Sequence, residues 1–172
     1  FGGEATQGME RFPYNTLNAE NPGISGFGDL YQNINQMNLF ISRTLHTDVL
    51  TESAKNYYLG QVYGLRAYYM YQLYRSWGDA VFTEEPSLGF EVGKLAKAAT
   101  PAAEIFEQVK KDIESSLSYF GPDYTIKEKK SLWSKAATLM LKADVYLWSA
   151  HRDGGEGDAR TAKNALVDIQ NN

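Results

Sequence analysis

The chain has 172 residues, of which 43% are hydrophobic and 22% charged, a composition that suits one globular domain with a sizeable core. Its formal net charge at pH 7 is −4, so it lacks the basic excess that neutralises phosphates, and we expect no nucleic-acid partner. The absence of cysteine excludes disulfides, thiolate metal ligands and a cysteine nucleophile from this stretch.

Residues 1–28 show neither helical nor strand periodicity, and we expect them to form an irregular loop segment. Pro13 and an Asn-Pro-Gly turn at 21–23 interrupt this segment. No run in the chain approaches the roughly 18 apolar residues that a membrane-spanning helix needs. The chain opens on Phe1 rather than methionine and ends at Asn172 inside an expected helix, so we interpret it as a fragment of a longer protein.

Two helices are expected next, at 29–46 and 51–77. Asn38 lies beside the apolar stripe of the first helix, where it is expected to be a partly buried hydrogen-bonding residue. Thr51 or Ser53 can cap the second helix. The apolar positions of the second helix step by three or four residues and are Ala54, Tyr58, Val62, Leu65, Tyr69, Leu73 and Trp77. A second apolar set lies on an adjacent face, which predicts a helix buried between neighbours.

The second helix also carries small residues in a row. Gly60, Gly64 and Ala67 form a smooth strip that predicts the close approach of another helix, since glycine otherwise costs a helix about 1 kcal/mol relative to alanine. Gly78 is expected to end this helix after Trp77, because glycine readily adopts the positive φ of a helix C-terminus.

Residues 79–100 have no sustained helical stripe and are expected to form a loop. The next helix is expected at 101–120, with Thr100 as its N-cap and Pro101 at its first position. Two further helices are expected at 131–150 and 159–171, separated by the glycine-rich break RDGGEGD.

This order of elements predicts an all-α fold. Short links imply antiparallel neighbours, so we expect antiparallel helix pairs of a degenerate tetratricopeptide-like type, an α-α superhelix with irregular loops. Residues 29–172 are expected to form this helical repeat-like domain.

The residues give no catalytic constellation. Gly23-Ile24-Ser25-Gly26-Phe27 lacks the final glycine of a nucleophile elbow. His46 and His151 each end an expected helix, where a histidine favours the helix dipole, and neither has a local set of metal ligands. The segment 153–158 places glycines where a calcium-binding loop needs oxygen side chains. We therefore expect no enzyme activity, no metal site and no cofactor.

Several segments in order resemble the SusD/RagB family. Residues 65–69 (Leu-Arg-Ala-Tyr-Tyr) and 73–79 (Leu-Tyr-Arg-Ser-Trp-Gly-Asp) are similar to its signature helix and the turn that follows. Residues 112–117, 134–147 and 162–169 resemble later helices of the family. Residues 80–82, Ala-Val-Phe, depart from the family's valine-proline-leucine. Order and spacing agree over most of this chain, which matches only the front and middle of a family protein.

The resemblance implies an outward-facing lipoprotein of the cell outer membrane, held by an acylated cysteine that this chain lacks. Such proteins bind oligosaccharide nutrients without catalysis and deliver them to a TonB-dependent transporter barrel of the SusC type. In the family, loops outside the helix pairs form much of the ligand surface, including the region before the first helix. This implies Arg11, Phe12, Tyr14 and Asn15 as candidate ligand-binding residues.

Two alternatives stay open from the sequence. One is a peptide-binding member of the same family, since this region does not fix the class of ligand. The other is an intracellular tetratricopeptide-like adaptor, which predicts a concave groove and a peptide ligand.

Overall fold

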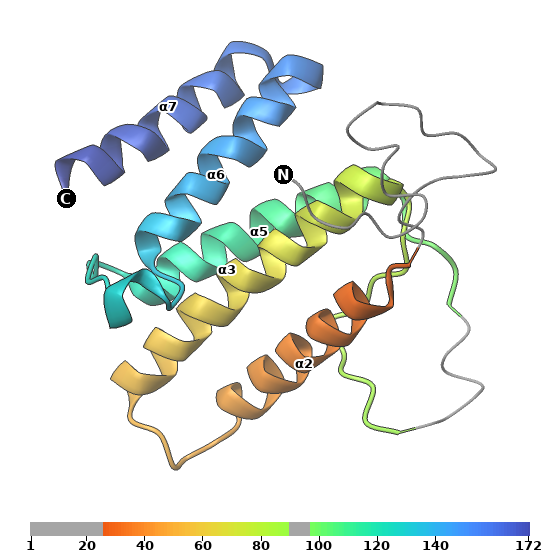
Figure 1. The fold of residues 1–172 in the computed structure, drawn as a ribbon, viewed down its shortest axis with the longest axis vertical. Helices are drawn as coiled ribbons and strands as arrows, with labels where there is room; N and C mark the ends of the chain where they lie inside the picture. The colour runs from red at the N-terminus through yellow and green to blue at the C-terminus, as the bar shows by residue number, and fades with distance from the viewer. Residues whose placement is uncertain (1–25, 90–96) are drawn as a thin grey trace, which may run out of the picture.

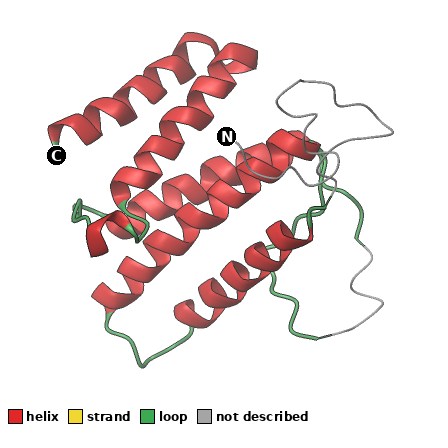
Figure 2. Cartoon of the chain, viewed as in Figure 1, coloured by secondary structure: helices red, strands yellow, loops and turns green. Residues whose placement is uncertain are grey.

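The computed structural model describes residues 26–89 and 97–172. The α-helices in these ranges are α2 (Gly28–Leu45), α3 (Glu52–Trp77), α5 (Ala102–Phe120), α6 (Lys135–Ser149) and α7 (Gly155–Asn171) (Figure 1). A 3-10 turn (Glu128–Lys130) precedes α6, and a π-helical turn (Ala150–Gly154) joins α6 to α7. Figure 2 shows no strand in the two described ranges, which confirms the expected all-α fold of antiparallel helix pairs.

The helix α3 holds the arrangement together, because it contacts α2, α5 and α6. The helices α2 and α3 form one antiparallel pair, and α5 runs back along α3 (Figure 1). The helices α6 and α7 form a second pair that extends away from the first three helices. The loop after α3 passes along α2 before the chain returns to α5, and this course brings segments far apart in sequence together.

The face of α3 that is most buried is not the longer stripe expected from the sequence. In that stripe Leu73 is buried, but Tyr58 is 41% exposed. The most enclosed positions lie on the adjacent face and include Leu59, Met70 and Tyr71. Both faces of α3 are apolar, so periodicity alone cannot rank them. The neighbours α2 and α5 decide which face the core covers.

Gly60 and Gly64 lie where other parts of the chain approach α3 closely. A Cβ at Gly60 would stand 3.0 Å from the ring of Phe120 in α5. A Cβ at Gly64 would meet the indole nitrogen of Trp133 and would stand 2.9 Å from Oγ1 of Thr138 in α6. These approaches place the start of α6 directly against the middle of α3.

Two helices begin at other residues than expected. The helix α6 begins at Lys135 rather than at 131, because Ser134 is its N-cap and accepts a hydrogen bond of 3.3 Å from the amide of Ala137. The helix α7 begins at Gly155 rather than at 159. The π-helical turn reverses the chain in fewer residues than the expected break, so the glycine-rich segment belongs partly to α7.

The start of α5 also differs from the expectation. Pro101 occupies the N-cap position of α5, and Thr100 does not cap the helix. Thr100 instead pairs with Ala80 through two backbone hydrogen bonds of 2.9 and 3.2 Å. The carboxylate of Asp79 accepts a hydrogen bond of 2.8 Å from the amide of Ala102, so a residue at the end of α3 satisfies the start of α5.

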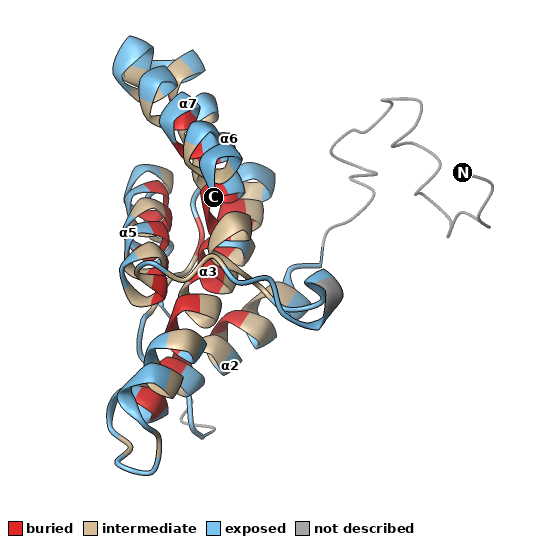
Figure 3. Cartoon of the chain, turned by 90° about the vertical axis from the view of Figure 1, so that its left-hand side faces the viewer, coloured by how far each residue is buried: buried red, intermediate tan, exposed pale blue. Residues whose placement is uncertain are grey.

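The core lies where α2, α3, α5 and α6 face one another, while their outer faces remain exposed (Figure 3). Its fully enclosed side chains include Met70, Ile105, Val109, Ile113 and Val145. Among the described residues, no helix is both long and apolar enough to cross a membrane.

Candidate functional site

The residues expected to contact ligand, Arg11, Phe12, Tyr14 and Asn15, lie outside the described residues. Trp77, Gly78 and Asp79 lie together where α3 ends and the loop 79–89 begins. Gly78 has a φ of +74°, and the Trp77 ring packs edge-on against Phe27 with the ring centroids 6.0 Å apart. The candidate site in the described residues is this loop, with the helices that hold it.

A buried polar network lies beneath the loop. The guanidinium of Arg66 in α3 donates two hydrogen bonds to the carboxylate of Asp112 in α5, at 2.6 and 2.7 Å. It donates a third hydrogen bond of 2.8 Å to the amide oxygen of Asn38 in α2. The three side chains are 3%, 1% and 2% exposed. The network therefore joins three helices at one point inside the core.

Electrostatics explain why the two charges occur together. Burial raises the pKa of the Asp112 carboxyl, and hydrogen bonds from Arg66 and Gln108 oppose this rise. Burial lowers the pKa of the Arg66 guanidinium, but Asp112 more than offsets this effect and leaves that pKa raised. Arg66 thus stays charged, and either residue without the other would leave an uncompensated charge in the core.

The network reaches the loop through Asn38. The side-chain amide of Asn38 donates a hydrogen bond of 2.6 Å to the backbone oxygen of Thr83. One turn earlier, Asn35 donates to the backbone oxygen of Ser87 at 3.2 Å and accepts from the Ser87 amide at 2.7 Å. Two asparagines of α2 thus fix two points of the loop without any strand or disulfide.

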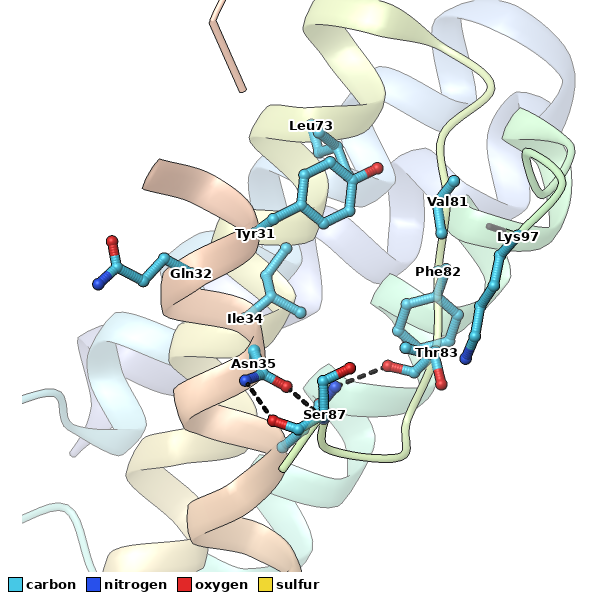
Figure 4. A pocket seen from close by; sticks show the side chains of 11 residues that line it. Tyr31, Gln32, Ile34, Asn35, Leu73, Val81, Phe82, Thr83, Ser87 and Lys97 are labelled. Atoms are coloured by element: carbon cyan, nitrogen blue, oxygen red, sulfur yellow. Dashed lines mark hydrogen bonds between the residues drawn. The ribbon is translucent and has the colours of Figure 1, made fainter. Parts of the chain in front are cut away.

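The loop 79–89, which these hydrogen bonds hold to α2, leaves a cleft against that helix, and we call it the α2–loop cleft (Figure 4). Its volume is about 340 Å³. Its lining residues are Tyr31, Gln32, Ile34, Asn35, Asn38, Leu73, Val81, Phe82, Thr83, Ser87 and Lys97. Asn35 and Ser87 close one end of the cleft, and Tyr31 and Leu73 lie at the other end.

A second cleft lies between α2, α3, α5 and residues 84–86 of the loop, and we call it the charged cleft. Its volume is about 290 Å³. Glu84 and Lys111 form an ion pair of 3.2 Å at this cleft, and Arg66 and Asp112 line it from below. Positive and negative groups therefore face each other there, in contrast to the α2–loop cleft.

Neither cleft contains a recognisable catalytic arrangement in the described residues. Glu84 and Glu85 lie in the charged cleft, but Glu84 pairs with Lys111. Within residues 26–89 and 97–172, no group of three or more His, Asp or Glu side chains is placed to hold a metal ion. The two clefts offer shape and hydrogen-bonding groups on a rigid helical support, which are features that a binding site needs.

The sequence pattern singles out Asn38 but does not predict its connection to Arg66 and Asp112. The predicted hydrogen-bonding role of Asn38 is confirmed, but its burial is complete rather than partial, with 2% of the residue exposed. Arg66 and Asp112 belong to the segments that resemble the family, and no contact between them was predicted. A signal was present, because each charge stands next to a core residue, Ala67 or Ile113, inside an apolar pattern.

The described residues define an all-helical, tetratricopeptide-like scaffold to which hydrogen bonds hold the loop 79–89. A family model described as SusD-like, starch-binding and associating with the outer membrane matches residues 12–147. The chain belongs to this SusD-like family. The glycan-binding proteins of this family associate with the outer membrane, which agrees with the resemblance found in the sequence.

Individual relatives extend this result. The chain is 32% identical to SusD-like protein P38 of Formosa agariphila over 113 residues, which are 64% of this chain and 20% of that protein. It is 51% identical to B. fragilis NanU, with a TM-score of 0.88 over 99% of this chain and 34% of that structure. A SusD superfamily protein from Bacteroides vulgatus is 49% identical, with a TM-score of 0.86 over 98% of this chain and 34% of that structure.

A laminarin-binding SusD-like protein shares the fold alone, with a TM-score of 0.72 at 21% identity. The chain thus spans about a third of the length of B. fragilis NanU and of the Bacteroides vulgatus protein, and a fifth of the length of SusD-like protein P38.

Proposed function

We propose that the protein binds oligosaccharide nutrients at the cell surface without cleaving them and delivers them to a TonB-dependent transporter barrel of the SusC type. The observation that carries this proposal is the match of residues 12–147 to a family of starch-binding proteins associated with the outer membrane. The helical scaffold supports it physically, because a binding loop needs a rigid base to hold its ligand contacts in place.

The ligand contacts that we propose are Arg11, Phe12, Tyr14 and Asn15. Aromatic rings can stack on the apolar faces of sugar rings, while guanidinium and amide groups bond to hydroxyls. These four residues offer both kinds of group within five positions, and they precede the first described helix in the sequence.

The same family assignment supports the location and the partner that we propose. We propose an outward-facing lipoprotein of the outer membrane, anchored through an acylated cysteine outside this chain. The helices α2, α3, α5 and α6 would present a rigid slab to the transporter barrel, and the loops would present the ligand. Glycan capture then precedes uptake, and chemistry on the glycan is left to other proteins.

The experiment is a titration of the intact protein with a panel of oligosaccharides and peptides, repeated with the Tyr14→Ala variant. Glycan binding that weakens in Tyr14→Ala supports both the function and the proposed contacts. Glycan binding that is unchanged in Tyr14→Ala keeps the function and rejects the contact at Tyr14. Binding of peptides alone rejects oligosaccharide capture and favours the peptide-binding alternative.

A further inference from the structure

The α2–loop cleft has the dimensions of a site for one small ring. Its volume of about 340 Å³ lies near the lower end of the roughly 300 to 1,000 Å³ found for small-ligand sites. Part of its lining is apolar, with Ile34 and Leu73 buried and the ring of Phe82 half-buried beside them. Such a surface favours the apolar face of a ring-shaped ligand.

The polar groups of the cleft are not equivalent. The amides of Asn35 and Asn38 are occupied by Ser87, Thr83 and Arg66, so they serve to hold the walls. The hydroxyl of Tyr31 points across the cleft toward Val81 (Figure 4).

Lys97 gives this cleft its charge. Among the described residues that line the cleft, Lys97 is the one with a formal charge, and that charge is positive. Its side chain runs beside Phe82 toward Thr83, along the wall opposite α2 (Figure 4). The described residues that line the cleft therefore carry one cation and no carboxylate, whereas the chain as a whole has a net charge of −4.

The charged cleft provides the contrast on the other side of the loop. There Lys111 already pairs with Glu84 at 3.2 Å, and Arg66 already pairs with Asp112. A bound anion would have to compete with these carboxylates. In the α2–loop cleft, no described lining residue offers such competition.

We propose that the α2–loop cleft binds a ring-sized carboxylate, with the ring against Ile34, Leu73 and Phe82 and the carboxylate at the ammonium of Lys97. The ligand could be a sugar acid or a carboxylate on a hydrocarbon ring, since both present an apolar face and one negative group. This site goes beyond the oligosaccharide contacts proposed at residues 11–15, and it can exist whether or not those contacts do.

The test titrates the intact protein by calorimetry with two acids and their neutral counterparts. Galacturonate is compared with galactose, and cyclohexanecarboxylate with cyclohexanecarboxamide. We expect at least one acid to bind in the millimolar range or tighter and its neutral counterpart to bind roughly tenfold more weakly, because a charge-assisted hydrogen bond is lost. Binding of galacturonate but not of cyclohexanecarboxylate would identify a sugar acid as the ligand class. Binding of cyclohexanecarboxylate but not of galacturonate would identify a hydrocarbon acid.

Variants locate the binding. Lys97→Met should weaken binding of the acid roughly tenfold, and Lys97→Arg should retain most of the affinity. Phe82→Ala should weaken binding of both the acid and its neutral counterpart, since it removes part of the apolar wall. Lys111→Met is the matched control, because it removes an exposed lysine from the charged cleft and should leave acid binding unchanged.

Several outcomes would overturn the proposal. These are no binding of either acid, equal binding of acid and neutral counterpart, or acid binding that survives Lys97→Met. The oligosaccharide titration with Tyr14→Ala is a separate measurement, so failure of one proposal is distinguishable from failure of the other.

Discussion

Arg66 and Asp112 form a buried ion pair through two parallel hydrogen bonds of 2.6 and 2.7 Å, with both side chains 3% exposed or less. The pair joins α3 to α5, and Asn38 connects it to α2 and then to the loop at Thr83. The geometry of the loop therefore depends on charges inside the core.

The first prediction is that either partner is costly to remove alone. Asp112→Ala should lower the free energy of unfolding by about 3 to 5 kcal/mol, because it leaves the Arg66 guanidinium buried and uncompensated. The double variant Arg66→Met/Asp112→Leu should recover most of this loss, because it removes both charges and retains volume. Urea denaturation of the three proteins measures both effects.

Glu107→Gln is the control for the ion-pair prediction. Glu107 pairs with Lys110 at 3.0 Å on the surface of α5, with the Glu107 side chain 71% exposed. This change should alter the free energy of unfolding by less than about 1 kcal/mol. A double variant that is no more stable than Asp112→Ala would show that the buried charges stabilise the fold directly.

The second prediction concerns the contact between α3 and α6. Gly64→Ala should destabilise the protein, because the added Cβ meets the indole nitrogen of Trp133, which donates a hydrogen bond of 2.8 Å to Thr138. Overpacking of this kind costs about 1 to 3 kcal/mol, against a helix-propensity gain of about 1 kcal/mol. The melting temperature should fall.

Gly157→Ala serves as its control, because no described atom lies within 4 Å of a Cβ built at this position in α7. It should leave the melting temperature unchanged or raise it slightly. If Gly64→Ala raised the melting temperature as well, the close packing against Trp133 would be wrong.

The third prediction concerns a buried hydroxyl. The side chain of Tyr71 is 0% exposed, and its hydroxyl finds no hydrogen-bond partner among the described residues. Tyr71→Phe should therefore be neutral or should stabilise the protein, since it removes a desolvated polar group without losing a bond. Equilibrium unfolding at pH 7 measures this effect, and a loss of stability would show that the Tyr71 hydroxyl has a hydrogen-bond partner, with Arg75, whose guanidinium lies over the Tyr71 ring, as the candidate.

Tyr71 also gives stability a dependence on alkaline pH. Burial raises the pKa of Tyr71 to about 12, from an ordinary value of 10.0. Above pH 10 the unfolded chain loses this proton while the folded protein keeps it, so the stability present below pH 10 declines up to about pH 12. The wild-type protein should lose more stability over this interval than Tyr71→Phe, and equal losses in the two proteins would contradict the raised pKa of Tyr71.

The fourth prediction concerns the strapping of the loop. Asn38→Ala removes the hydrogen bond to Thr83 and leaves a donor of Arg66 unsatisfied in the core, at a cost of about 1 to 3 kcal/mol. Amide hydrogen exchange in residues 79–89 should accelerate. Asn35→Ala removes exposed hydrogen bonds to Ser87 and should accelerate exchange near Ser87 with little change in global stability. Identical exchange in wild type and Asn38→Ala would show that the loop is held by other contacts.

The sequence predicts the helices well because the three- and four-residue apolar steps are long and uninterrupted. It does not predict which face of α3 is enclosed, because both faces are apolar and the neighbours make the choice. The cap of α5 by Asp79 could not be predicted, since the two residues that bond are 23 positions apart and a local candidate, Thr100, was available.

In the candidate site, too, the sequence predicts local features but not contacts between distant residues. The sequence predicts Asn38 as a partly buried hydrogen-bonding residue, because it adjoins an apolar stripe. Its partners Arg66 and Thr83 lie 28 and 45 residues away, and only the packing of three helices brings them together. The α2–loop cleft depends on this long-range contact and has no local signature in the sequence.

The most direct test of the proposed function is calorimetric titration of the intact protein with purified oligosaccharides, followed by mass analysis of the glycan after prolonged incubation. We predict saturable binding of at least one oligosaccharide and recovery of the glycan at its original length. Absence of binding across the panel, or recovery of shortened glycan, would contradict non-catalytic capture.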